Sequence, residues 1–284
     1  MPRIPGNPEV LLHNSLDGHE NNTILRYMSL EQFKVLLSKG LHLTRADNFT
    51  KDDPFEGEFA ELVYNICEQH NFFSEQDGKR TPMKDSSKKD AMGIRELSYV
   101  SCWTLSDNEN VALWRLYGNI AVQTTVTDLK AAIEFFLASS RERNARLMNA
   151  LKKEMVKVAY IDHRTTDEKI YRDMIKTKPI TKLLHYKNVG YQYEGEVRVI
   201  FYGAEGCTGA ARELGQKCYL GIKPQDFVHK ILISPFADNS FFSRVKNEME
   251  LHGPEIHKMS NLVEWSSLKF PPGAEKTGTE FETI

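Results

Sequence analysis

The sequence predicts an α+β protein in which strands and helices are mixed along the chain. Segments with a period of two and segments with helical spacing follow each other without a regular βαβ rhythm, which favours α+β over a doubly wound sheet. With 284 residues and 40% hydrophobic content, the chain can bury a core. No internal repeat and no linker divides it, so we expect one domain.

The predicted domain covers residues 23–270. Residues 1–22 are rich in Asn, Pro and Gly, so we expect a flexible N-terminal lead-in. Residues 271–284 predict a polar tail. Inside the domain, residues 74–94 carry few large apolar groups, which predicts a mobile excursion.

The first elements have clear local signals. Residues 24–27 predict a strand, and Ser29 with Gln32 forms a capping-box pattern for the helix that follows. Gly40 is expected to end that helix. Alternation predicts a strand over 41–44, and an acidic loop at 52–57 leads into a helix predicted over 59–70.

The remaining elements follow from hydrophobic spacing and from Gly positions. We expect further strands over 97–104, 120–126, 156–161, 193–202, 217–222, 228–233 and 262–265. We expect helices over 111–117, 129–155 with a break at 139–140, 180–185 and 241–251, and a loop or hairpin over 204–217.

Composition predicts a soluble, cytosolic globular protein. The formal net charge of −2 means that nucleic acid or an anionic membrane could bind only at a local patch. No apolar run approaches the roughly 20 residues that span a bilayer, and the N-terminus lacks the apolar core of a signal peptide. The four cysteines have no CxxC spacing, which indicates reduced thiols rather than disulfides or zinc ligands.

The run from Tyr193 to Phe201 is the most informative segment. In an extended strand Glu194 and Glu196 would lie side by side on one face. Neighbouring carboxylates repel each other, but they suit a site that holds a sugar hydroxyl and an incoming nucleophile. The alternative is the solvent face of an edge strand, on which Arg198 pairs with the glutamates.

Four blocks in the sequence carry a resemblance to known proteins. They are Leu25-Arg26-Tyr27, Asp53-Pro54-Phe55-Glu56-Gly57, Val100-Ser101-Cys102-Trp103 and Tyr193-Glu194-Gly195-Glu196-Val197-Arg198. Their order and spacing resemble a widespread, largely uncharacterised bacterial domain family over roughly residues 24–270. The same layout is similar to the Arg-Ser-Glu class of ADP-ribosyltransferases, which implies an α+β fold with a split mixed β-sheet core flanked by helices.

The resemblance implies roles for individual residues. Arg26 would be the first-strand Arg, Ser101 the middle-strand Ser and Glu196 the catalytic Glu, with Glu194 as the upstream member of the pair. Ser101 is followed by Cys102-Trp103, whereas the family Ser usually lies in a Ser-Thr-Ser context. Tyr27 or Trp103 would stack against the nicotinamide ring.

The implied activity is cleavage of NAD, as co-substrate, and transfer of ADP-ribose to RNA, DNA or protein. Glu196 would stabilise an oxocarbenium-like ribose, Arg26 would bind pyrophosphate or ribose, and Glu194 would act as base for the acceptor. By analogy alone, the role would be that of a bacterial toxin or phage-defence effector with a cognate antitoxin or inhibitor.

Two other functions stay open. A metal-dependent nuclease or hydrolase could use Asp52, Asp53, Glu194 and Glu196, and a non-catalytic interaction module could share the fold. The basic region at 141–157 is either a solvated helix face or a nucleic-acid patch. Asp53 and Glu56 most simply cap the helix that follows.

Overall fold

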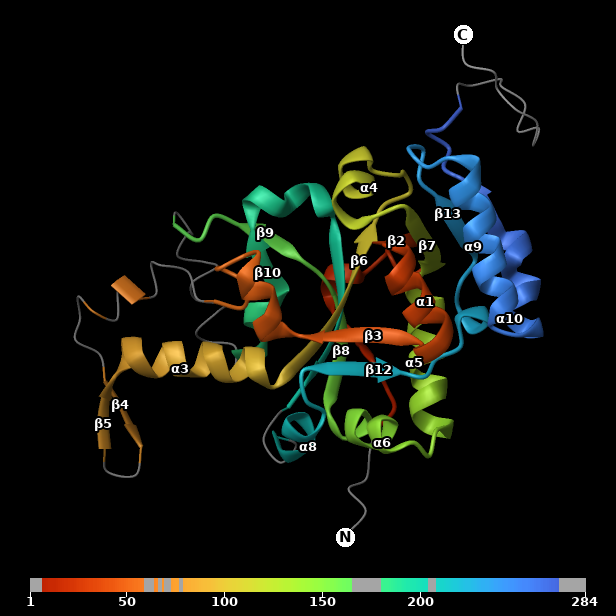
Figure 1. Ribbon diagram of the computed structural model, residues 1–284. Coiled ribbons are helices and arrows are strands. Elements are labelled where there is room, and N and C mark those ends of the chain that lie inside the picture. The colour runs from red at the N-terminus through yellow and green to blue at the C-terminus, as the bar shows by residue number, and fades with distance from the viewer. Residues whose placement is uncertain are drawn as a thin grey trace.

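The computed structural model describes residues 7–58, 64–65, 68, 73–76, 79–164, 180–203 and 208–270. As predicted, the fold is α+β, with a mixed central sheet flanked by helices (Figure 1). The main path of the sheet runs β1-β8-β11-β6-β2-β7-β13-β14, and β3 and β12 join it through β6. These strands are β1 (Leu11–Leu12), β2 (Thr23–Met28), β3 (Leu41–Arg45), β6 (Ser98–Leu105), β7 (Ile120–Thr125), β8 (Lys152–Lys157), β11 (Glu196–Tyr202), β12 (Lys217–Leu220), β13 (Lys230–Ile233) and β14 (Val263–Trp265).

The sheet divides at β6. One edge of β6 pairs antiparallel with β11, from Ser98 opposite Tyr202 to Thr104 opposite Glu196. The other edge is shared, because β2 pairs only near Thr104 and β3 pairs only near Tyr99 and Val100. Residues 101–103 of β6 therefore face the fork where β2 and β3 diverge, and β3 runs across the direction of β6 in Figure 1.

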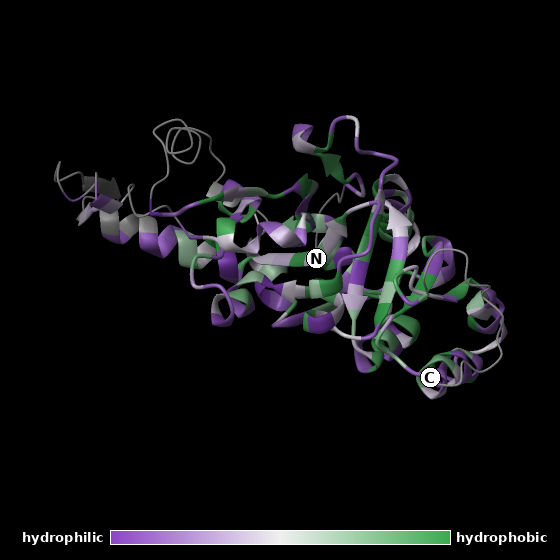
Figure 2. Cartoon of the chain, turned by 90° about the horizontal axis from the view of Figure 1, so that it is seen from above, coloured by the Kyte–Doolittle hydropathy of each residue, from purple (hydrophilic) through white to green (hydrophobic). Residues whose placement is uncertain are grey.

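Helices cover both faces of the sheet. The larger core lies on one face and contains apolar side chains of α1 (Leu30–Lys39), α5 (Val126–Ser139), α6 (Arg143–Ala150), α8 (Thr208–Glu213), α9 (Asn239–Leu251) and α10 (Pro254–Lys258). On the opposite face, α4 (Val111–Tyr117) packs Leu113 and Trp114 against β2, β7 and β13. Figure 2 shows hydrophobic and hydrophilic residues next to each other on the central strands and on the helices that flank them.

A third group of short elements surrounds the fork. These are the 3₁₀ helices η2 (Ala46–Lys51), η3 (Ile180–His185) and η4 (Val189–Glu194), and the parallel pair β9 (Ala159–Ile161) and β10 (Tyr186–Asn188). On the face of the sheet opposite the larger core, Leu184 of η3 packs with Val100, Val156 and Ile200. This small cluster fixes η3 and β10 beside β11.

The capped helix after β2 forms as predicted. The Ser29 hydroxyl accepts a hydrogen bond from the Gln32 N–H at 3.2 Å, and the Gln32 side chain accepts one from the Ser29 N–H at 2.8 Å. The helix ends at Gly40, whose φ is +80° and where a Cβ would lie 2.1 Å from the Leu220 carbonyl oxygen. Only Gly lets β12 approach this closely.

Several expected elements differ in the structure. Residues 83–94 of the expected excursion form most of α3 (Met83–Glu96), which follows the antiparallel pair β4 (Phe73–Gln76) and β5 (Lys79–Pro82). Ala91 is buried, and Arg95 donates to the Gly57 carbonyl at 3.2 Å, so a mostly polar helix is anchored at its C-terminal end. The expected helix over 129–155 ends at Ala150, because Lys152 already begins β8, and α8 lies within the expected loop over 204–217.

The ends of the chain are described only in part. Residues 10–16 of the expected lead-in contact the main body: β1 pairs in parallel with β8, and Val10 and Leu16 are buried. Residues 1–6, most of the expected helix over 59–70 and the expected tail at 271–284 lie outside the described residues. No helix in the described part of the chain combines the length and apolarity needed to cross a bilayer.

Candidate functional site

A pocket of about 300 Å³ lies at the fork of the sheet. Its walls come from β2, β3 and β6 on one side and from β10, η4 and β11 on the other. Five of the six predicted site residues line it: Arg26, Tyr27, Trp103, Glu194 and Glu196. Ser101 is the sixth, and it is fully buried in contact with Arg26.

Arg26 bridges the fork. Its Nη1 donates to the Ser101 hydroxyl at 2.9 Å and to the His42 carbonyl oxygen at 3.3 Å, and its guanidinium lies 5.9 Å from the centre of the Trp103 ring. Among the described residues it has no carboxylate partner. Burial lowers its pKa, because the charged form loses water without gaining an anion. An uncompensated guanidinium in a pocket wall is suited to an anionic ligand.

The two predicted aromatic site residues are packed into the core. Trp103 is 2% exposed, contacts Phe227 edge-on at 6.3 Å and donates its indole N–H to Ser101 at 3.1 Å. The Tyr27 hydroxyl accepts from the Asn110 N–H at 2.9 Å, and its ring meets Trp114 edge-on at 4.8 Å. Both residues line the pocket, but most of each ring contacts other side chains of the protein interior.

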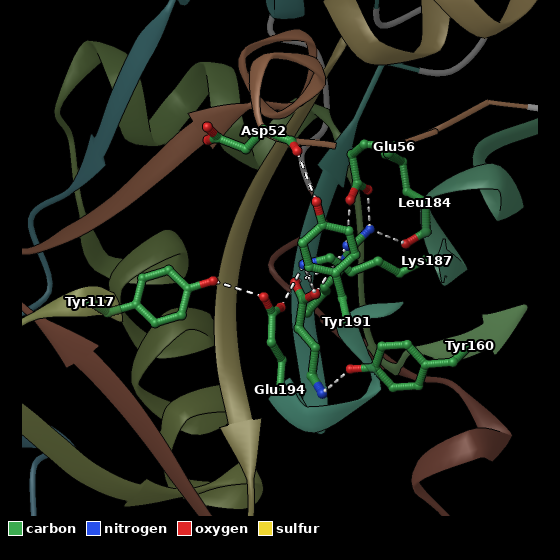
Figure 3. Close-up of polar contacts among 10 residues, drawn as sticks. Asp52, Glu56, Tyr117, Tyr160, Leu184, Lys187, Tyr191 and Glu194 are labelled. Carbon is green, nitrogen blue, oxygen red and sulfur yellow. Dashed lines mark hydrogen bonds and ion pairs between the residues drawn. The ribbon is translucent and has the colours of Figure 1, made fainter. Parts of the chain in front are cut away.

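The prediction that Glu194 and Glu196 extend from one face of one strand is wrong. Glu194 ends the 3₁₀ helix η4, and Glu196 begins β11. Gly195 lies between them in the left-handed region with φ +52°, a conformation that Gly adopts easily. The two carboxylates still converge, because the Lys187 ammonium lies 2.5 Å from Glu194 Oε2 and 3.2 Å from Glu196 Oε2 (Figure 3).

Arg198 holds Glu196 from the other side. It lies two residues along β11 and therefore on the same face. Its Nε and Nη2 donate to the two Glu196 oxygens at 2.8 and 3.1 Å, and Nη1 and Nη2 donate to Glu56 at 2.5 and 2.9 Å. Nη1 also reaches the Leu184 carbonyl at 2.8 Å. The pairing with Arg198 is therefore real, but β11 is a buried central strand and not a solvent-facing edge.

These contacts set the ionisation of the network. Burial alone would raise the pKa of Glu196, but the charges of Arg198 and Lys187 outweigh it and lower that pKa to about 2. For Lys187, burial lowers the pKa, and the two glutamates outweigh that effect and raise it. Burial raises the pKa of Glu56, and Arg198 opposes this only in part. Glu196 thus remains a carboxylate at any physiological pH.

Two tyrosines complete the surroundings of the glutamates. The Tyr117 hydroxyl donates to Glu194 Oε1 at 2.8 Å, and its pKa is raised by burial and by that carboxylate. The Tyr160 hydroxyl accepts the Glu196 N–H at 2.7 Å, and burial raises its pKa to about 12. Figure 3 shows both pointing toward the pair.

Sequence reasoning missed Lys187 and the role of Glu56, and it placed the pairing with Arg198 on a solvent-facing edge strand. Arg198 had a signal, since its spacing from Glu196 places both on one face. Lys187 had none, because tertiary pairing of β10 with β9 brings it to the site. Glu56 was interpreted as a helix cap, but it is 2% exposed and bonded to Arg198. Asp53 does accept a local N–H, from Phe55 at 2.9 Å, while its second oxygen is buried and has no partner in the part of the chain that the structure describes.

The remaining polar clusters lie away from this pocket. In the 141–157 region, Arg141, Arg143 and Arg146 are exposed, whereas Lys153 is buried and donates to the Asn149 and Leu151 carbonyls. None of them lines the pocket. Cys102, which unlike these groups lines the pocket, and Cys218 are free thiols, and Cys67 and Cys207 lie outside the described residues.

Within the described ranges, no three or more His, Cys, Asp or Glu side chains are arranged to hold a metal ion. Comparison of the chain with protein-family models, with curated proteins and with solved structures finds no match in any of the three.

Proposed function

We propose that this pocket binds NAD and that the protein is an NAD-dependent ADP-ribosyltransferase. One observation carries the proposal: an uncompensated guanidinium and a permanently ionised carboxylate line one pocket at the fork. Arg26 comes from β2, its partner Ser101 from β6, and Glu196 from β11. NAD requires both charges, an anion site for pyrophosphate and a carboxylate beside the ribose that becomes cationic.

The proposed reaction breaks the bond between the ribose C1′ and the nicotinamide nitrogen, and the electron pair leaves with nicotinamide. Glu196 stabilises the cationic character left on the ribose. The acceptor nucleophile then bonds to C1′ and loses its proton. Glu194 is the base for this proton, because Lys187 holds it beside Glu196.

The acceptor is a macromolecule, either nucleic acid or protein. Two exposed tyrosines beside Glu194 support such docking: Tyr117, which lines the pocket, is 46% exposed, and Tyr193, which precedes Glu194 in the chain, is 44% exposed. A role as toxin or phage-defence effector with a cognate inhibitor rests on the resemblance alone.

The rival metal-dependent hydrolase receives less support from the geometry. The Lys187 ammonium already lies between Glu194 and Glu196, where a divalent cation would have to bind. The non-catalytic module predicts instead that the ionisation of Glu196 has no functional consequence.

The test is an assay of nicotinamide release and of transfer from biotinylated NAD to a cell extract. Glu196→Gln should lose both activities by roughly 10²–10³-fold, since it removes the charge that stabilises the transition state. Glu194→Gln should still release nicotinamide but lose transfer. Glu154→Gln is the matched control, because Glu154 pairs with His185 at 2.8 Å outside the pocket, and it should behave as wild type.

Thermal unfolding of each variant separates loss of activity from loss of folding. If folded wild type neither consumes NAD nor labels any component, the transferase proposal fails. Activity that needs Mg²⁺ and ignores NAD would support the hydrolase instead.

A further inference from the structure

A second hollow of about 300 Å³ lies on the other side of Arg26. It is enclosed by α1, β3 and β12, and it shares Arg26, Tyr27, Gln32 and His42 with the first pocket. The two hollows are therefore neighbours that meet at an uncompensated guanidinium. A ligand with two bulky halves joined by an anionic bridge would fit this arrangement, with one half in each hollow and the bridge at Arg26.

The second hollow is cationic. Lys217 lines it together with Arg26, and neither has a carboxylate partner in the described part of the chain. The lining carboxylate, Glu31, lies 3.2 Å from the Lys34 ammonium. Burial, reinforced by Arg26 and Lys217, lowers the pKa of His42 to about 4, so this imidazole is neutral at pH 7.

The wall next to β12 offers both an aromatic surface and an unused polar atom. The Tyr219 ring lies 5.0 Å from the His42 ring at an interplanar angle of 35°. His42 Nε2 is buried and has no hydrogen-bond partner among the described residues, which is costly unless a ligand or water supplies one. A flat, polar heterocycle would satisfy both features.

We propose that this second hollow binds the adenosine half of a dinucleotide, with the base against Tyr219 and His42 and the phosphates between Arg26 and Lys217. The assignment rests on the proposed function: with the nicotinamide ribose at Glu196, the pyrophosphate must pass Arg26. The exposed Lys39 ammonium now lies 5.2 Å from the Tyr219 ring. An exposed ammonium is held weakly at the half-buried Tyr219 ring, whereas a nucleobase stacks more strongly, so the base can replace it.

The test measures binding of AMP and, separately, of nicotinamide mononucleotide by calorimetry. Tyr219→Ala should weaken AMP binding about tenfold, the loss expected for one stacked base, and leave nicotinamide mononucleotide binding unchanged. Tyr219→Phe keeps the ring and should bind AMP as wild type does. Lys217→Met, at an exposed residue that should not affect folding, should weaken binding of AMP but not of adenosine.

The inference is overturned if AMP fails to bind, or if AMP binding is unchanged in Tyr219→Ala and Lys217→Met. The results also distinguish this inference from the proposed transferase activity. AMP binding that depends on Tyr219, without any NAD turnover, would support the adenosine subsite and contradict the transferase activity. NAD turnover with the same KM in Tyr219→Ala and Lys217→Met as in wild type would support the transferase activity and contradict the subsite.

Discussion

Two arginines line the same pocket in opposite electrostatic states. Arg198 is 1% exposed and is bonded on both sides to carboxylates, those of Glu56 and Glu196. Within the described ranges, Arg26 donates only to neutral oxygens, those of Ser101 and His42. The charge of Arg198 is balanced by carboxylates, whereas no described carboxylate balances the charge of Arg26.

We interpret the Arg198 network as part of the structural scaffold and Arg26 as part of the proposed binding surface. A buried charge without a partner is costly, so a chain that keeps one at a pocket wall gains most when an anion arrives there. The network of Arg198 instead fixes the position of Glu196 and keeps it ionised. Three tests compare the two arginines, from the largest expected effect to the smallest.

Removing Arg198 should give the largest loss of stability. In Arg198→Met the carboxylates of Glu56 and Glu196 stay buried with their main partner gone, and breaking such a pair costs about 3–5 kcal/mol. Urea unfolding at pH 7 measures the change. Arg143→Met is the matched control, because its exposed contact with Glu213 should be worth less than about 1 kcal/mol. Equal losses in the two variants would contradict a structural role for Arg198.

Acid should act on the Arg198 network and not on Arg26. The pKa of Glu196 is about 2 in the folded protein and 4.5 when unperturbed. A depressed carboxyl pKa contributes stability above pH 4.5, and that stability is lost as pH falls toward 2, by about 3 kcal/mol in total. Glu56 has a raised pKa and works in the opposite direction, so the informative quantity is the difference between wild type and Glu196→Gln.

Unfolding midpoints between pH 5 and pH 2 provide that difference. Wild type should lose stability more steeply than Glu196→Gln over this range. Arg26→Met should keep the wild-type slope, since no described carboxylate pairs with Arg26. A parallel decline in wild type and Glu196→Gln would show that Glu196 has an ordinary pKa.

Removing Arg26 should affect binding more than folding. Arg26→Met loses hydrogen bonds to neutral groups, so the free energy of unfolding should change by only about 1 kcal/mol. Loss of a charge-assisted contact to phosphate should weaken ADP-ribose binding about tenfold or more. Calorimetry with ADP-ribose and urea unfolding test the two parts together. If Arg26→Met were destabilised as much as Arg198→Met and still bound ADP-ribose like wild type, Arg26 would be a structural residue and not a binding residue.

Local signals in the sequence predicted local structure well. The Ser29–Gln32 capping box, the helix stop at Gly40 and the alternating pattern of β3 each depend on a few neighbouring residues. α3 was missed because its face is mostly polar and its stability depends on contacts with η2 and η3.

The site was predictable only in part, since several of its partners are distant in sequence. Glu196 and Arg26 were identified from their blocks, but Lys187 reaches the glutamates only through the pairing of β10 with β9. The fork depends on β2 and β3 sharing one edge of β6, a feature that no single segment encodes. The extended form assumed for residues 194–196 did not account for the left-handed φ that Gly195 permits.

Gly195 also separates the two glutamates into different elements, so that their positions are determined independently. Glu196 is tied to the sheet register through its pairing opposite Thr104, whereas Glu194 follows the course of η4. A residue inserted or deleted in η4 would therefore move one carboxylate past the other without shifting any rung of the β-ladder. In the proposed reaction, such a change would displace the base for the acceptor and leave the carboxylate of Glu196 in place.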